Sequence, residues 1–152
     1  MKRFRFPLRP VAVLRSHQEL RARETFAASV HTYVQTEETL AGVRTRVAQF
    51  EASLFSGRRE RFSAADEAQA LAAYRRECAA EAEAERTMIA ARGQMNQRRQ
   101  EYLDAHRRLE VVKRLEEKAK VRHRQEQARD EQAEFDDFAG RRFLSRRAQT
   151  VS

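Results

Sequence analysis

Hydrophobic residues recur at seven-residue intervals in two separate stretches of the chain. In the second stretch alanines interleave with the larger side chains, so the spacings alternate between three and four. This pattern predicts a coiled-coil seam on each of two helices. The seam positions are Phe26, Tyr33, Leu40, Val47 and Leu54 in the first helix and Met88, Met95, Tyr102 and Leu109 in the second.

The repeat is interrupted between the two stretches. Gly57 suits the left-handed residue that ends a helix, and Ser63 with Asp66 has the form of a capping box in which Asp replaces Glu or Gln. These signals predict a first helix over about 11–55 and a turn at about 56–65. Because a short connection makes long helices antiparallel, we expect an all-α fold, an antiparallel two-helix coiled-coil hairpin.

The second helix is predicted to be the longer one. Residues 66–139 contain no proline and a single glycine, Gly93. A continuous helix of that length would span roughly 110 Å. With the turn centred near residue 60, residue i faces about residue 120 − i, which leaves 110–139 as an unpaired overhang of ~30 residues, or ~45 Å. A lone helix this polar is marginal, so we expect a partner to order it.

The ends of the chain complete the predicted organisation. Pro7 and Pro10 favour an extended, basic lead-in over residues 1–10, which is expected to cover only the first turns of the overhang. The hairpin is predicted to occupy residues 11–139. Gly140 is the expected helix stop, followed by a basic flexible tail at 140–152.

Composition indicates a thin core and basic ends. Charged residues make up 36% of the chain and hydrophobic residues 41%, many of them alanine, and the net charge is +8. Residues 1–15 and 140–152 hold basic residues and no acid. This distribution is compatible with solvated tails, an acidic protein partner, a membrane surface or nucleic acid. Nucleic-acid binding is not expected, because aromatic residues do not alternate with a continuous basic groove.

Residue types that carry chemistry are scattered. The four histidines lack a cysteine or acid at metal-ligand spacing, and no glycine-rich phosphate loop is present. Cys78 is the only cysteine, which fits a reducing compartment, and no apolar run is long enough to cross a membrane. Arg98 interrupts the alanine row of the second seam and is expected to be solvated or paired with Glu37 or Glu51. We therefore predict a cytoplasmic protein that is not an enzyme and binds no cofactor or metal.

Several segments taken together resemble the flagellar export protein FliJ family. They are F-x-F-x-L-x-x-V-x-x-L-R at 4–15, K-R-L-E-E-K at 113–118 and E-Q-A-E-F-D-D-F-A at 131–139. The middle of the chain, with Gly57, Ser63 and Leu71-x-x-Tyr74, is similar to the family's turn and second-helix start. Asp137-Phe138 departs from the family's more frequent acid-Leu pair.

The resemblance implies a stalk in the flagellar type III protein export apparatus. Such proteins are antiparallel two-helix coiled coils, similar to the rotor stalk of rotary ATPases. They insert into the pore of the export ATPase hexamer and promote its assembly. They also contact the export-gate membrane protein and help to cycle export chaperones, at the cytoplasmic face of the membrane beneath the flagellar basal body. Their association with the membrane is therefore indirect.

Two sets of contact residues are predicted within this frame. The basic ends of the chain match the inserted end of a rotary stalk, so the candidates for contact with the ATPase pore are Arg9, Arg15, Lys113, Lys120, Arg122 and Arg124. An apolar stripe near the turn is expected to be exposed and to dock the export gate. Its residues are Leu71, Tyr74 and Cys78, and packing of the turn is an equally good explanation for them.

The sequence pattern is also compatible with two other functions. The chain could be a generic structural coiled coil that self-associates, in which case residues 56–63 would be helical in a parallel dimer. It could also be the stalk of a virulence type III secretion system, which a related subfamily serves with the same architecture.

Overall fold

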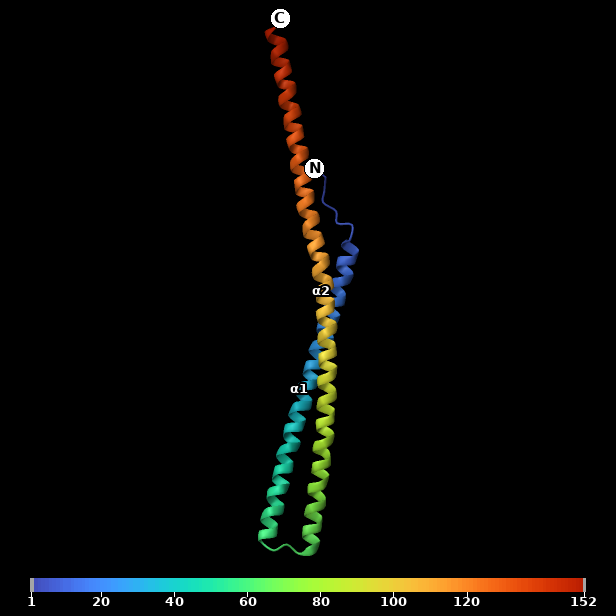
Figure 1. Ribbon diagram of the computed structural model, residues 1–152, viewed down its shortest axis with the longest axis vertical. Helices are drawn as coiled ribbons and strands as arrows, with labels where there is room; N and C mark the ends of the chain where they lie inside the picture. The colour runs from blue at the N-terminus through green and yellow to red at the C-terminus, as the bar shows by residue number, and fades with distance from the viewer. Residues whose placement is uncertain (1, 152) are drawn as a thin grey trace. The chain divides into compact units, whose positions relative to one another are not determined.

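The computed structural model describes residues 2–151 and contains two long helices (Figure 1). Helix α1 spans Arg9–Arg59 and helix α2 spans Ala64–Thr150, with no strand in the described residues. The helices pack against each other as an antiparallel hairpin in which the second helix is the longer, which confirms the predicted fold class. Contacts divide the chain into a first unit, Met1–Gln18 with His106–Ser152, and a second unit, Glu19–Ala105.

The core of the second unit is a narrow seam between α1 and α2. The rings of Phe26 and Tyr102 stack across it, with centroids 6.0 Å apart and planes 6° from parallel. Leu40, Val43 and Leu54 are its buried apolar side chains. The remaining predicted seam residues of this unit are half-buried, namely Tyr33, Val47, Met88 and Met95. Because few apolar side chains are fully removed from water, the hairpin has little hydrophobic stabilisation to lose.

Ion pairs between the helices flank the seam of the second unit. Arg44 Nε lies 3.4 Å from Glu81 Oε1, and Arg46 Nε lies 3.6 Å from Glu77 Oε2. Half-exposed pairs of this kind each contribute little to stability. Their opposite signs nevertheless disfavour other alignments of the two helices, so they help to fix the register.

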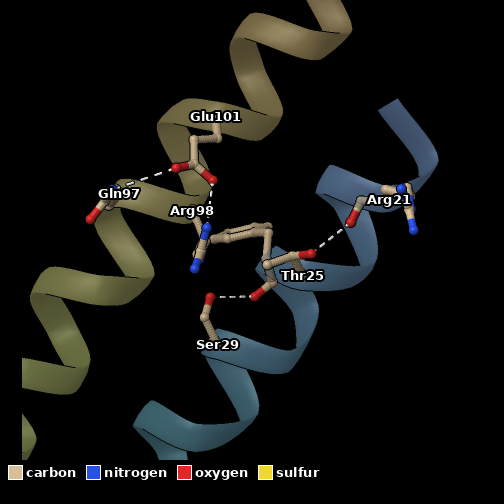
Figure 2. Close-up of polar contacts among 7 residues, drawn as sticks. Arg21, Thr25, Ser29, Gln97, Arg98 and Glu101 are labelled. Atoms are coloured by element: carbon tan, nitrogen blue, oxygen red, sulfur yellow. Dashed lines mark hydrogen bonds and ion pairs between the residues drawn. The ribbon is translucent and has the colours of Figure 1, made fainter. Parts of the chain in front are cut away.

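Arg98 is paired within its own helix. Its Nη1 donates to Glu101 Oε2 over 3.0 Å, and Gln97 Nε2 donates to the other carboxylate oxygen over 3.5 Å (Figure 2). The predicted pairing with Glu37 or Glu51 of α1 is therefore wrong. On α1, Thr25 and Ser29 donate their hydroxyl hydrogens to carbonyl oxygens of their own helix. Because an acid lies one turn further along α2, Arg98 is neutralised without a partner from α1.

Residues 60–63 connect the two helices. Arg61 adopts the left-handed conformation, with a φ of 65°. Gly57 remains helical, so the prediction that it ends the first helix is wrong. Ser63 caps α2 as predicted, because its Oγ accepts a hydrogen bond from the backbone N–H of Asp66 over 3.2 Å.

Gly57 is required by close packing rather than by its backbone angles. A Cβ at this position would overlap the ring of Phe62, whereas a Cβ at Gly42 would meet nothing within 4 Å. Gly57→Ala is therefore expected to displace the ring and to lower the free energy of unfolding by about 1–3 kcal/mol. Gly42→Ala, the matched control in the same helix, should raise it by about 0.5–1 kcal/mol. Urea unfolding followed by circular dichroism measures both, and equal effects of the two substitutions would contradict this account.

In the first unit the extended lead-in runs alongside α2. The ring of Phe4 lies 5.4 Å from that of His123, and Gln127 Nε2 donates to the carbonyl oxygen of Lys2 over 3.1 Å. The buried apolar residues of this unit are Leu109 and Val112. The lead-in therefore reaches much further along α2 than the first turns of the predicted overhang.

The predicted extent of the overhang is wrong at both ends. The relation i to 120 − i would place residue 111 opposite Arg9, but Arg9 pairs with Glu116. The turn is centred nearer residue 62, which shifts each facing residue along α2, and the lead-in covers several further turns. At the other end α2 continues through Gly140 to Thr150, so the predicted helix stop and the predicted tail at 140–152 are corrected. One glycine costs a helix only about 1 kcal/mol, and no proline follows it.

Candidate interaction surfaces

The six candidate cations for the ATPase contact all belong to the first unit. Arg9 Nη1 lies 3.2 Å from Glu116 Oε1, and Lys120 Nζ lies 3.9 Å from the same oxygen. This shared carboxylate joins the start of α1 to α2. The groove beside it is lined by Arg3, Phe4, Arg5, Phe6, Arg9, Glu116 and Lys120.

Three further candidate cations have contacts only along their own helices. Arg15 is half-buried and donates to Gln18 Oε1 over 2.9 Å. Lys113 lies 3.8 Å from Glu110, and Arg124 lies 3.5 Å from Glu117. Exposed ion pairs of this kind are weak and break readily when a stronger acidic partner arrives.

Arg122 is the most available of the six cations. It is exposed, and within residues 2–151 it forms no hydrogen bond or ion pair. We call Arg9, Lys113, Lys120, Arg122 and Arg124, together with the lead-in cations Lys2, Arg3 and Arg5, the cationic surface of the first unit. Its positive charges are held at most by exposed, weak ion pairs, so an acidic protein surface can compete for them.

Sequence reasoning missed the role of the lead-in in this surface. It treated Lys2, Arg3 and Arg5 as terminal charge and His123 as a scattered histidine. The signal was present, because the seven-residue repeat through Leu109 continues to residues 116 and 123. Glu116 and His123 are half-buried, as expected for positions that face a partner segment.

The predicted stripe near the turn lies on the seam face. Leu71, Tyr74 and Cys78 are half-buried, so the expected exposure of the stripe is wrong, whereas its contact with the export gate stays a prediction. A hydrogen bond with Cys78, and then the negative charges of Glu51 and Glu81, raise the pKa of Tyr74. Glu51 belongs to α1, which indicates that Tyr74 faces that helix. Tyr74 lies two heptads before Met88, so the seven-residue repeat already placed it on the seam face of α2.

Other apolar side chains are exposed at the turn end of the second unit. Phe55 is 72% exposed, and Phe62 borders a shallow groove on the first turns of α2. Phe55 follows the seam residue Leu54 directly, so it points away from α2. The position of Phe55 directly after a seam residue was the sequence signal that could have predicted its exposure.

A polar cluster occupies the seam of the second unit at the end away from the turn. Glu19 is buried, and its Oε1 accepts a hydrogen bond from Arg23 Nη2 over 2.7 Å. This hydrogen bond, followed by one with Tyr102, raises the pKa of Arg23. A polar group at a seam position stabilises less than an apolar one but specifies the pairing of the helices.

A lead-in, two long helices and a short turn, in this order along the chain, are consistent with the result of the comparison with known families. The model of the flagellar FliJ protein family matches residues 4–148 of the 152. The chain belongs to the flagellar FliJ protein family. No curated protein and no solved structure matches it.

The FliJ match covers the lead-in, both helices and most of the terminal part of α2. Membership implies a role in flagellar type III protein export. Among the described residues, no helix is long and apolar enough to cross a membrane. No group of three or more His, Cys, Asp or Glu side chains in residues 2–151 is arranged to hold a metal ion.

Proposed function

We propose that the chain is a coiled-coil stalk of the flagellar export apparatus that binds the export ATPase ring through its first unit. The cationic surface would contact acidic residues of the ATPase pore. Binding there would promote assembly of the hexamer, because one stalk would touch several subunits around the pore. The observation that supports the proposal most directly is that all six candidate cations belong to one unit.

The stalk would link the ATPase to the rest of the export machinery. We propose contacts with the export-gate membrane protein at the turn end of the second unit and with export chaperones. Its location would be the cytoplasmic face of the membrane beneath the basal body. Co-sedimentation with the flagellar export ATPase tests the proposal, and use of the ATPase of a virulence secretion system in parallel distinguishes the two kinds of stalk. Failure to bind either ATPase would refute the assignment.

The gate contact can be separated from packing of the turn. In the gate-docking proposal, the accessible edges of Leu71 and Tyr74 touch the gate protein. Changing both to alanine is then expected to lower recovery of the gate protein in a pull-down by about tenfold, a typical loss for central interface residues. Helicity must be retained in circular dichroism. Phe55→Ala is the matched control, since it removes an exposed aromatic side chain from the same end. A greater loss with Phe55→Ala would move the contact to the outer face of α1.

A further inference from the structure

The terminal part of α2, residues 128–150, presents aromatic side chains to solvent. Every residue in this segment is exposed. Phe135 is 70% exposed, Phe138 64% and Phe143 65%, and Leu144 is 65% exposed. Phe135, Phe138 and Phe143 lie on one broad face of the helix, and exposed aromatic groups gathered on one face mark an interaction site.

The charges of the same segment are divided into two blocks. Residues 130–137 carry five acids and no base, and residues 141–147 carry four arginines and no acid. Gln132 donates to Asp136 Oδ1 over 3.0 Å. Within residues 2–151, no ion pair joins the acidic block to the four arginine side chains. The segment therefore holds two opposite, unneutralised surfaces on either side of Ala139.

We propose that this segment pairs antiparallel with the same segment of a second copy of the chain. A surface whose halves carry opposite charge is complementary to its own copy when the copy is rotated by two-fold symmetry. In the register that places Ala139 against Ala139, Asp137 comes level with Arg141 and Asp136 with Arg142 of the second copy, so the acidic block lies alongside the arginine block. Phe135 and Phe143 lie one turn to either side of Ala139 on the same helix face, and this register brings them level with each other.

The charge blocks distinguish antiparallel from parallel pairing. A parallel pair would place the acidic block against the acidic block of the second copy and is disfavoured.

Charge exchange in the full chain tests the pairing. Asp136→Arg with Asp137→Arg is expected to raise the dimer dissociation constant by about tenfold or more, because both positions then carry the same charge as the arginine block that lies alongside them. Arg141→Asp with Arg142→Asp should do the same. An equimolar mixture of the two variants should restore the dimer, because the exchanged positions of one variant then come level with opposite charges of the other. Sedimentation equilibrium measures each sample, and circular dichroism checks that helicity is kept.

Cross-linking fixes the alignment. In a Cys78→Ser background, Ala139→Cys is expected to form a disulfide-linked dimer on mild oxidation, because position 139 faces itself. Ala128→Cys, the matched control on the same helix, should not, since its counterpart lies near residue 150. Cross-linking at both positions would indicate a parallel pair and overturn the proposal. A chain that stays monomeric, or a mixture that does not recover the dimer, would also overturn it and leave the aromatic surface to a different protein. These outcomes do not depend on ATPase binding.

Discussion

Reversing three charges of the cationic surface is expected to abolish co-sedimentation with the flagellar export ATPase. Lys120→Glu, Arg122→Glu and Arg124→Glu change positions that are exposed and are held at most by weak ion pairs within α2. If these side chains face pore acids, each attraction becomes a repulsion that costs several kcal/mol, and the affinity should fall by about 100-fold or more. Co-sedimentation at two salt concentrations measures the loss.

A matched variant separates this effect from a change in net charge. Arg75→Glu, Arg76→Glu and Arg99→Glu alter the total charge equally, but all three are exposed residues of the second unit. This control should bind the ATPase within about threefold of the unmodified chain, since distant exposed charges are screened by salt. Equal losses in the two triple variants would show that binding depends on overall charge and would refute a defined contact surface.

Removing one side chain from the seam is expected to melt most of the second unit. Leu40 is 4% exposed and is one of five buried apolar residues in residues 2–151. Leu40→Ala should lower the free energy of unfolding by about 2–5 kcal/mol, through lost burial and the cavity left behind. In a hairpin with so thin a core, that is a large part of the total stability. Thermal melting followed by circular dichroism should show a markedly lower midpoint.

The control for this change is Leu20→Ala. Leu20 lies on the same helix and in the same unit, but it is 46% exposed. Its substitution should alter the free energy of unfolding by less than about 0.5 kcal/mol, as is usual for surface positions. If both leucines prove equally important, the seam face of α1 has been assigned incorrectly.

The seven-residue repeat and the Ser63 cap predicted the fold because both are local signals. The repeat at Phe26 and Tyr102 identifies the faces of two helices, and a serine cap requires only three following residues. The position of the turn was harder to predict from the sequence. Gly57 satisfied a common rule for helix ends, but its actual role depends on the ring of Phe62. That contact is tertiary, and no local pattern contains it.

The candidate surfaces were also predicted to different extents, because some of their contacts follow from local patterns and others are tertiary. The grouping of cations in the first unit follows from antiparallel pairing, which brings residue 9 and residue 116 together. The lead-in was misjudged because an extended segment has no periodicity of its own, and the signal for its path lay in the repeat of α2 at Glu116 and His123. The stripe at Tyr74 was misjudged although the repeat was informative there. Arg98 pairs with Glu101 of its own helix rather than with an acid of α1, because contacts within a helix compete with contacts across a seam.

The path of the lead-in has a practical consequence for experiments with fusion proteins. Since the carbonyl oxygen of Lys2 is bound by Gln127, a tag joined ahead of Lys2 would emerge beside the cationic surface. A bulky tag there would shield those charges and imitate a binding-deficient variant. A tag after Thr150 would be held away from that surface by the remaining turns of α2, although it would lie close to the proposed pairing segment. An affinity label for ATPase binding therefore belongs at the carboxyl terminus, and one for self-association belongs at the amino terminus.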